Sequence, residues 1–341
     1  MTKRLLVHAA PAALALCLAA PAVRAADALP RLGADLGQTS VSGFSSGAFM
    51  AGQFGVAYSS IVRGVGMIAG GPYYCTGEPA SDPPLRNALT RCMNPRFART
   101  DPPDAVSLWR SARRFARRGL IDDTAHLARQ RVYLFNGAQD QILTSAVTDQ
   151  TRRFYDMAGA LSITYVNHER AGHGMVTDRP GDNDCGASYQ PFFNNCGIPL
   201  ARHILAALYG PMLPASAQPG GRLLHFSQRN YAKPASGMAP TGYLFVPTAC
   251  EAGGCRVHVA FHGCWQGAQA VGDHFYRHAG YNGTADANRI IVLYPQVAAS
   301  TAPFNPAGCW DYWGYTNPDY YTRRGLQLSA VRAMLKRLSE R

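Results

Sequence analysis

Gly43-Phe44-Ser45-Ser46-Gly47 lies between a strand-like segment, residues 39–42, and a helix-like run that continues through Phe54. The pattern Gly-x-Ser-x-Gly in a strand–turn–helix setting is typical of a nucleophile elbow, a sharp turn that exposes the serine hydroxyl. Glycines are needed there because the turn is tight and the serine backbone is strained. An ordinary Gly/Ser loop can have the same letters, so it is the setting that favours Ser45 as a nucleophile.

A serine nucleophile needs a general base, and the base needs a carboxylate that orients it. In folds with this elbow the partners follow in the order Ser, Asp, His, on loops after later strands. Asp140 follows the strand-like run 131–135, and His173 follows the run 161–166. Both therefore belong at the edge of the sheet where Ser45 lies. We predict a Ser45–His173–Asp140 triad.

Other readings of these residues remain open at this level. Asp140 could instead cap a turn or a helix. His168 is a rival base, but it lies closer to its strand, where a structural histidine is more common. The rival acids are Asp149 and Asp178.

The oxyanion of an acyl-transfer reaction needs two backbone N–H donors. One is expected from Ser46, the residue after the nucleophile. The second usually comes from a loop that follows a strand and carries a His-Gly pair. Here Phe261-His262-Gly263-Cys264 has that form, which predicts the N–H of Cys264 as the second donor. A structural cysteine in a turn does not exclude this role.

Strand-like and helix-like runs alternate along the rest of the chain. The helix-like runs include 200–208 and a C-terminal run in which apolar residues recur at spacings of 3, 4 and 3. Such alternation predicts an α/β fold with a mostly parallel sheet and helices on both faces. Residues 222–246 are more typical of an antiparallel hairpin. The strand-like runs are 65–69, 131–135, 161–166, 222–226, 242–246, 256–261 and 289–294.

The order of these strands is unusual. In an ordinary α/β-hydrolase the His-Gly strand precedes the nucleophile strand, whereas here it follows Ser45 by more than 200 residues. If residues 222–294 supply the hairpin and the next two strands, the fold is a circularly permuted α/β-hydrolase. Permutation is tolerated when chain termini lie close together at the surface. We expect one catalytic α/β-hydrolase domain over residues 26–341.

The N-terminus predicts export. Lys3 and Arg4 precede an apolar run that ends in Val23-Arg24-Ala25, which is typical of a secretory signal peptide (residues 1–25) cut after Ala25. A membrane anchor is the alternative, but the uninterrupted run is short for a span of about 20 residues. We therefore expect a secreted protein, extracellular or periplasmic, with no membrane association after cleavage.

Composition limits the classes of function. The 341 residues include 33 Lys+Arg and 21 Asp+Glu, with 47% hydrophobic and 16% charged residues, which excludes a disordered protein. Signal cleavage leaves 30 basic and 21 acidic residues, a net charge of +9. A basic surface can indicate nucleic-acid binding, but no nucleic-acid motif accompanies it. A solvated helix face is favoured for the cluster Arg110, Arg113, Arg114, Arg117 and Arg118.

Cleavage also leaves an even number of cysteines. Eight cysteines in an exported chain favour disulfides, and zinc is less favoured because no C-x2-C or H-x3-H pair is present. Although 105 pairings are possible, we predict that neighbours in the sequence pair. The expected disulfides are Cys75 with Cys92, Cys185 with Cys196, Cys250 with Cys255, and Cys264 with Cys309.

Five segments of the sequence together are far more specific than the elbow alone. They are Val41–Gly47, Gln53–Ser59, Ala171–His173, Phe261–Gln266 and Asn305–Trp310. On these segments the chain resembles the single-domain, circularly permuted poly(3-hydroxybutyrate) (PHB) depolymerases. The resemblance implies an extracellular serine esterase with the triad and oxyanion donors given above. Gly174 departs from the pattern, because a larger or hydroxyl residue is expected after the histidine.

A solid aliphatic polyester is the substrate and partner that the resemblance implies, and an enzyme without a binding domain must adsorb to it through its own apolar surface. We predict that Trp265, Trp310 and Trp313 line the substrate cleft, with a contribution from tyrosines at 73, 74, 320 and 321. We expect a monomer without metal or cofactor that binds no nucleic acid. The alternatives are a secreted feruloyl or acetyl carbohydrate esterase and a non-catalytic polymer-binding protein.

Overall fold

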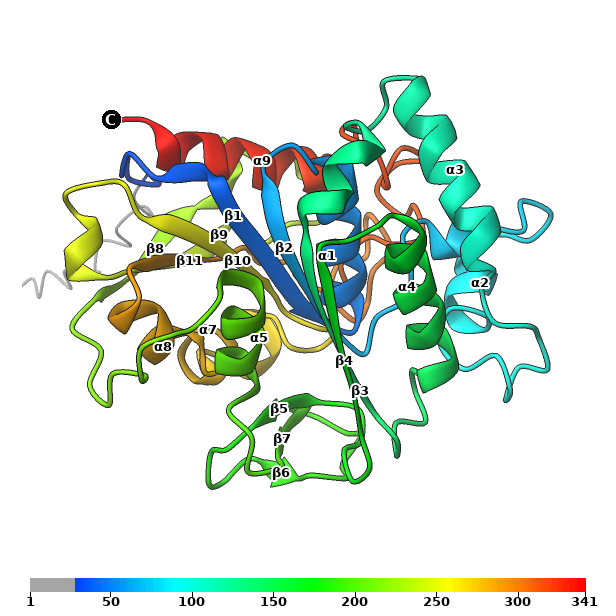
Figure 1. The fold of residues 1–341 in the computed structure, drawn as a ribbon, viewed down its shortest axis with the longest axis horizontal. Coiled ribbons are helices and arrows are strands. Elements are labelled where there is room, and N and C mark those ends of the chain that lie inside the picture. Colours follow the sequence, from blue (N-terminus) through cyan, green and yellow to red (C-terminus); the bar gives the residue numbers. More distant parts are fainter. Residues whose placement is uncertain (1–27) are drawn as a thin grey trace, which may run out of the picture.

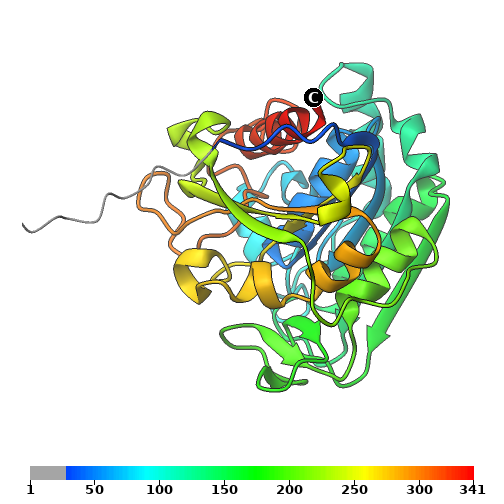
Figure 2. The ribbon, with the colours of Figure 1, turned by 90° about the vertical axis from the view of Figure 1, so that its left-hand side faces the viewer.

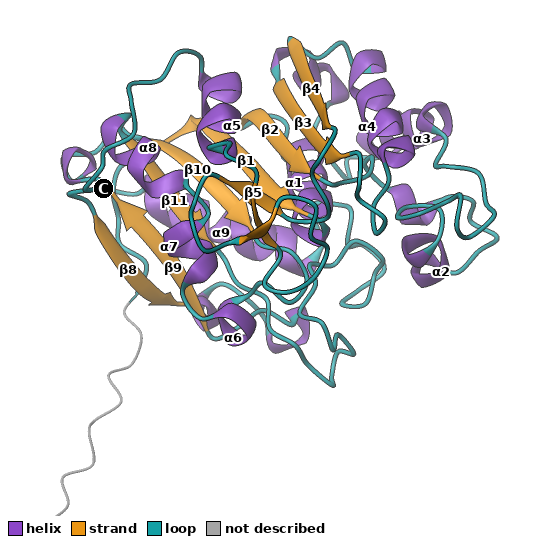
Figure 3. Ribbon diagram, turned by 90° about the horizontal axis from the view of Figure 1, so that it is seen from below, coloured by secondary structure: helices purple, strands orange, loops and turns teal. Residues whose placement is uncertain are grey.

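The computed structural model describes residues 28–341, and the predicted signal peptide lies outside the described residues (Figure 1). Its centre is an eight-stranded sheet in the order β4-β3-β2-β1-β10-β11-β9-β8 (Figure 3). Only β9 runs against its neighbours in this sheet. The strands are β1 (Asp35–Phe44), β2 (Val62–Ile68), β3 (Arg131–Gly137), β4 (Ser162–His168), β8 (Arg222–Ser227), β9 (Thr241–Val246), β10 (Arg256–Phe261) and β11 (Ile290–Tyr294).

Helices cover both faces of this sheet, as the alternation of strand-like and helix-like runs predicts (Figure 3). On one face lie α1 (Ser46–Ala57), α3 (Ala105–Arg117), α4 (Ser145–Met157) and α9 (Leu326–Ser339). On the other lie α5 (Leu200–Tyr209), α7 (His274–His278) and α8 (Tyr281–Ala287). The short helices α2 (Pro84–Leu89) and α6 (Ala268–Val271) belong to the loops.

A second, small sheet was not predicted from the sequence. It has the order β5-β7-β6 and is built from β5 (Met175–Thr177), β6 (Asn183–Asp184) and β7 (Phe193–Asn195). The disulfide between Cys185 and Cys196 links the segments that carry β6 and β7. Strands of two or three residues are too short to give a period-2 pattern, so the sequence carried no signal for them.

The predicted circular permutation is confirmed by the order of the strands. β1 opens the chain, yet it lies in the middle of the sheet, in parallel register with β10. The hairpin β8–β9 forms the edge of the sheet beyond β11, to which β9 is hydrogen bonded. Both ends of the described chain meet, because the N–H groups of Leu32 and Ala34 donate to the carbonyl of Leu338, at 3.2 and 3.0 Å (Figure 2).

Alternation along the central strands sends side chains to two separate cores. In β10, Val257, Val259 and Phe261 face α1 and α9, whereas Ala260 faces the other core. All of these side chains are buried. Strands that are apolar on both faces are typical of a parallel sheet enclosed by helices. This double burial fixes the register, because a shift of one residue would exchange the two faces.

Four disulfides stabilise the loops, and all four predicted pairs are confirmed. The pair Cys264–Cys309 closes the longest loop, with a sequence separation of 45. A cross-link over a loop of this length stabilises the fold by about 4 kcal/mol in the chain-entropy description.

A polar network lies buried in the core on the face of the sheet that α5, α7 and α8 cover. His258 points away from α1 and bonds to the hydroxyls of Ser40 and Ser42, at 2.6 and 2.7 Å. The hydroxyls of Tyr209 and Tyr281 complete the network. Burial lowers the pKa of His258 to about 3, so the imidazole is neutral in the folded protein.

We predict that this network makes the fold sensitive to acid. The folded pKa of His258 lies below the unfolded value of about 6.5, so the unfolded chain binds more protons between these two values. Stability therefore falls as the pH drops below about 6.5. Between pH 7 and pH 5 the protonation of His258 in the unfolded chain lowers the free energy of unfolding by roughly 2 kcal/mol. Denaturant titrations at both pH values should show a smaller loss for His258→Gln than for wild type. The exposed His225→Gln serves as control, and an unchanged loss in His258→Gln would contradict the prediction.

Candidate active site

The predicted elbow has the expected geometry. Ser45 joins β1 to α1 with a φ of 54° and a ψ of −120°, a backbone conformation that L residues rarely adopt. A Cβ atom at Gly43 would lie 2.2 Å from the carbonyl oxygen of Gly47. A Cβ atom at Gly47 would lie 2.4 Å from the carbonyl oxygens of both Phe261 and His262. The two glycines are therefore required by close packing of the backbone.

The three predicted triad residues come together. The Ser45 Oγ lies 3.0 Å from Nε2 of His173, and Nδ1 of His173 lies 2.7 Å from Oδ2 of Asp140. Asp140 and His173 are buried, whereas Ser45 is partly exposed. The second carboxylate oxygen of Asp140 accepts from the N–H groups of Ile142 and Leu143 at 2.9 and 2.8 Å. These bonds leave Oδ2 directed at the imidazole.

Local contacts orient the His173 loop. The backbone N–H of His173 donates to the hydroxyl of Ser188 at 2.9 Å. The imidazole ring packs against the rings of Phe44 and Phe192, at centroid distances of 4.7 and 6.0 Å. A Cβ atom at Gly137, which ends β3, would lie 2.1 Å from the carbonyl oxygen of Ala171. The loops that carry the acid and the base thus touch. Of these contacts, only the one at Gly137 involves a glycine, and the sequence analysis did not single that glycine out.

The rival residues lie elsewhere. His168 ends β4 and stacks against Phe135, at 6.1 Å between ring centroids. Asp149 lies on α4 and faces Tyr165. Asp178 is exposed. In the described part of the chain, none of the three is hydrogen bonded to Ser45 or His173.

The predicted oxyanion donors lie on two adjacent elements. Ser46 is the first residue of α1, and Cys264 belongs to the loop that Gly47 contacts through Phe261 and His262. Within residues 28–341, neither N–H donates a hydrogen bond to a protein acceptor. The N-terminus of a helix also carries a partial positive charge, which stabilises an anion beside it. Both donors are therefore available to a developing oxyanion.

Two side chains that sequence analysis did not single out hold this loop. Gln266 accepts from the N–H of Gly263 at 2.9 Å and donates to the carbonyls of Pro191 and Phe192. His262 accepts from the N–H of Val297 at 3.1 Å through Nε2, so Nδ1 carries the proton and bonds to the carbonyl of Gly263, at 2.7 Å. Burial lowers the pKa of His262 to about 4, which keeps it neutral. Both residues belong to the segment Phe261–Gln266, which the sequence had marked without assigning their roles.

The three tryptophans predicted to contact substrate differ. Trp265 is 48% exposed and stacks on Phe192, which packs against His173. Trp313 is half-buried beside Tyr312 and lines a hollow of about 460 Å³. The indole of Trp310 is fully buried, so the prediction that it lines the cleft is wrong. Its backbone N–H instead donates to the Ser46 hydroxyl at 3.2 Å.

The tyrosines behave in the same divided way. Tyr73 and Tyr320 are buried, which excludes them from an adsorption surface, whereas Tyr74 and Tyr321 are half-buried. Tyr74 and Tyr321 line the same hollow as Trp313. Proximity to a sequence motif therefore does not predict whether an aromatic side chain is exposed.

A buried carboxylate that the sequence analysis missed shapes the Trp313 loop. Asp311 accepts from the N–H groups of Trp313, Gly314 and Tyr315 through Oδ1, and from Thr316 through Oδ2. Burial raises the pKa of Asp311, although the Thr316 hydroxyl and these N–H groups oppose the shift. The side chain thus fixes the turn that presents Trp313.

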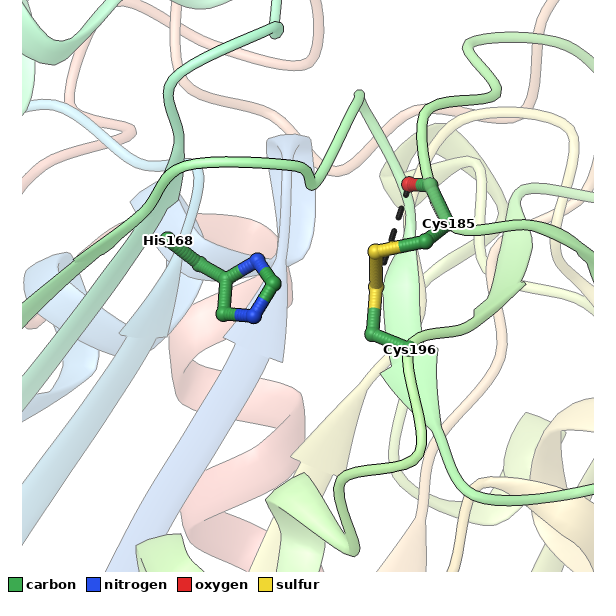
Figure 4. Close-up of side chains that lie close together, drawn as sticks. All are labelled: His168, Cys185 and Cys196. Carbon is green, nitrogen blue, oxygen red and sulfur yellow. Dashed lines mark hydrogen bonds between the residues drawn. A yellow bond between two sulfur atoms is a disulfide. The ribbon is translucent and has the colours of Figure 1, made fainter.

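One group of possible metal ligands occurs among residues 28–341, and it does not form a metal site. The imidazole of His168 faces Cys185 and Cys196 (Figure 4). These two cysteines form a disulfide, so neither offers the thiolate that zinc requires.

The sheet order, the elbow at Ser45 and its hydrogen-bonded His173 and Asp140 define the chain as a circularly permuted α/β-hydrolase. The chain is 40% identical to the poly(3-hydroxybutyrate) depolymerase of Delftia acidovorans and 33% identical to the polyhydroxybutyrate depolymerase of Talaromyces funiculosus. The alignments cover 97% and 92% of this chain, and 65% and 93% of the relatives. The chain belongs to the PHB depolymerase family.

Comparison of structures agrees. The crystal structure of PHB depolymerase from Penicillium funiculosum matches with a TM-score of 0.81 and 30% identity, over 92% of this chain and all of that one. A serine-to-alanine variant of a PHB depolymerase, in complex with an R3HB trimer, gives the same values. No family model matches the sequence. The chain spans 65% of the length of the Delftia relative.

The contact at Gly47 generates a prediction. Gly47→Ala places a methyl group against two carbonyl oxygens, at 2.4 Å, so the His262 loop and α1 must move apart. Because overpacking of this kind typically costs about 1–3 kcal/mol, we expect a lower Tm and at least about a tenfold loss of kcat/KM on a soluble aryl ester. Gly220→Ala is the matched control, because its Cβ meets nothing within 4 Å. Wild-type kinetics in Gly47→Ala would refute the close packing.

Proposed function

We propose that this chain is a secreted carboxylic ester hydrolase that depolymerises poly(3-hydroxybutyrate) to hydroxyacid oligomers and monomers. The observation that carries the proposal is the hydrogen-bonded chain from Ser45 through His173 to Asp140, in a member of the PHB depolymerase family. A polymer-binding protein without catalysis would have no need of this arrangement.

In the proposed reaction Ser45 attacks the carbonyl carbon of an ester of the polymer. His173 accepts the Ser45 proton through Nε2, which lies within hydrogen-bond distance. Asp140 holds the imidazole in the tautomer with Nδ1 protonated and stabilises the imidazolium that forms. Burial of Asp140 and His173 strengthens this electrostatic interaction.

The tetrahedral oxyanion would lie between the N–H groups of Ser46 and Cys264. Removal of one such donor typically costs about 10²–10³ in kcat. The alcohol end of the polymer then leaves with the proton from His173, which gives an acyl-enzyme on Ser45. Water, deprotonated by His173, attacks this ester; the acid is released and Ser45 leaves with the proton from His173, which restores the free enzyme. The residues already named supply each of these steps.

Apolar side chains around Ser45 support adsorption to a solid polyester. Tyr189, Trp265 and Phe304 are exposed on the loops that hold His173 and Cys264. Phe97 is 88% exposed, on a segment that is tied to the Asp140 loop because Asn94 donates to the carbonyl of Gln141, at 2.8 Å. Exposed apolar groups that gather near a cleft are typical of a binding surface.

The proposal includes the location and state of the protein. The predicted signal peptide and the four disulfides favour the extracellular space or the periplasm. Over residues 28–341, no helix combines the length and the apolar character needed to span a bilayer. We propose a monomeric protein with one catalytic domain over residues 26–341. We also propose that it binds no nucleic acid and that the exposed arginines of α3 form the solvated face of a helix packed on its other side.

Clearing of a PHB suspension tests the substrate and the nucleophile together. We expect wild type to clear the suspension and Ser45→Ala to leave it turbid, since removal of the nucleophile lowers kcat by about 10⁶. Ser60→Ala is the matched control, because it removes the same hydroxyl from an exposed position. Loss of soluble ester hydrolysis in Ser45→Ala, with no clearing by wild type, would instead favour the feruloyl or acetyl esterases.

Adsorption can be tested separately from chemistry. We expect Phe97→Ser and Phe304→Ser to reduce the fraction of enzyme that binds a PHB film several-fold, because each buried aromatic side chain contributes roughly 2 kcal/mol. The kcat/KM for a soluble ester should stay unchanged. Leu161→Ser is the control, since Leu161 is exposed just before β4. It therefore lies at the amino ends of the parallel strands, whereas Ser45 lies at their carboxyl ends. Equal adsorption of all three variants would contradict the proposed surface.

A further inference from the structure

The loop that carries His173 is closely packed on both sides of the histidine. A Cβ atom at Gly172 would lie 2.3 Å from the carbonyl oxygen of Ala187. A Cβ atom at Gly174 would lie 2.5 Å from Cγ of Asn194, and 2.6 Å from both Nδ2 and Oδ1 of the same side chain. The two glycines that flank the histidine therefore leave no room for a side chain against this neighbouring segment.

Asn194 lies at the centre of this contact. It belongs to β7, the middle strand of the small sheet (Figure 1), and it is fully buried. Its Nδ2 donates to the carbonyl of Ala187 at 2.7 Å and to the carbonyl of Cys185 at 3.2 Å. The Cys185 carbonyl also accepts from the backbone N–H of Gly172, at 2.9 Å. The Asn194 amide and the His173 loop therefore share a carbonyl acceptor.

The other end of the amide is unsatisfied. Oδ1 of Asn194 is buried and has no hydrogen-bond partner among residues 28–341. A buried acceptor in this state lowers the stability of the fold. Departures of this kind from the most stable arrangement are typical of functional sites, where they are compensated elsewhere in the structure. A function therefore explains this polar side chain better than stability alone.

We propose that Asn194 is a positioning residue for the catalytic base. Its amide occupies the space beside Gly174 and holds the turn that packs on Gly172, so the backbone on both sides of the histidine is fixed. The inference rests on the proposed function, because it requires His173 to act as the base. It also explains the glycine that follows the histidine, since a larger residue there would collide with the amide.

The catalytic geometry is sensitive to such positioning because His173 uses both ring nitrogens. Nε2 lies 3.0 Å from the Ser45 hydroxyl, and Nδ1 lies 2.7 Å from the Asp140 carboxylate. Displacement of a catalytic group by about 1 Å can lower the rate by about 10²-fold. In the described chain, both hydrogen bonds of the Asn194 side chain go to backbone carbonyls and not to Ser45. Loss of the amide should therefore lower kcat and leave KM for a soluble ester nearly unchanged.

A double-mutant cycle tests this contact, with kcat measured on a soluble aryl ester per active site titrated by an organophosphate. We expect Asn194→Ala to lower kcat about tenfold, because the His173 loop loses its lateral support. We expect Gly174→Ala to lower kcat by at least about tenfold, because its methyl group collides with the amide. In the double variant the methyl group enters the space that the amide vacates. Its kcat should therefore be several-fold higher than that of Gly174→Ala alone.

Two matched variants serve as controls. Asn195→Ala removes the amide of the next residue in β7, whose side chain points to the opposite face and accepts from the N–H of Gly197. Gly220→Ala adds a methyl group that meets nothing within 4 Å. Both should keep the kcat of wild type. If Asn194→Ala does not fold, Asn194→Ser takes its place in the cycle, since the hydroxyl keeps a donor and the smaller side chain still makes room.

Wild-type kcat per active site in Asn194→Ala would overturn the proposal, because a residue that only stabilises the fold changes Tm and not kcat. Losses that simply add in the double variant would overturn it as well. His173→Ala is measured alongside, to separate this inference from the proposed function. An inactive His173→Ala with a fully active Asn194→Ala refutes this inference alone, whereas wild-type kcat in His173→Ala refutes the proposed base and the role of Asn194 with it.

The substrate is separated from the positioning role by PHB clearing with the same samples. No clearing by wild type, with the expected cycle on the soluble ester, would refute the proposed substrate and leave the role of Asn194 in place.

Discussion

The contact between Gly47 and the carbonyl oxygens of Phe261 and His262 joins the two parts of the permuted chain. On one side is the first turn of α1, which carries the nucleophile elbow. On the other is the end of β10, which arrives more than 200 residues later. Because no side chain separates them, the Ser46 and Cys264 N–H groups belong to one rigid unit.

Several weaker constraints converge on the same loop. The disulfide from Cys264 to Cys309, the side chain of Gln266 and the neutral His262 each fix a different backbone group. A preorganised pair of donors does not have to reorient when charge develops, which is the main source of electrostatic catalysis. The bonds from Gln266 to the carbonyls of Pro191 and Phe192 also link the Cys264 loop to the segment that packs on His173. The predicted base and the predicted oxyanion donors are therefore positioned together.

Much of this could be predicted from the sequence, for physical reasons. The strands are apolar on both faces, so each gave a clear run, and the elbow glycines marked backbone contacts that admit no side chain. The triad positions followed because the ends of parallel strands share one edge. The fate of Trp310 could not be predicted, since its motif fixes proximity to Cys309 but not burial. Gln266 bonds to the carbonyls of a loop distant in sequence, and Asp311 accepts from the N–H groups of its own turn. Neither kind of contact leaves a periodic pattern in the sequence.

The meeting of the two chain ends beside Leu338 has a geometric consequence for work on solid material. Ser45 follows the last residue of β1, whereas the described chain enters at the opposite end of that ten-residue strand, about 30 Å away. A tether or a fused module at either terminus would thus extend from the side of the molecule opposite Ser45. The edge of the sheet that carries Ser45 would then remain free to contact the surface of a film.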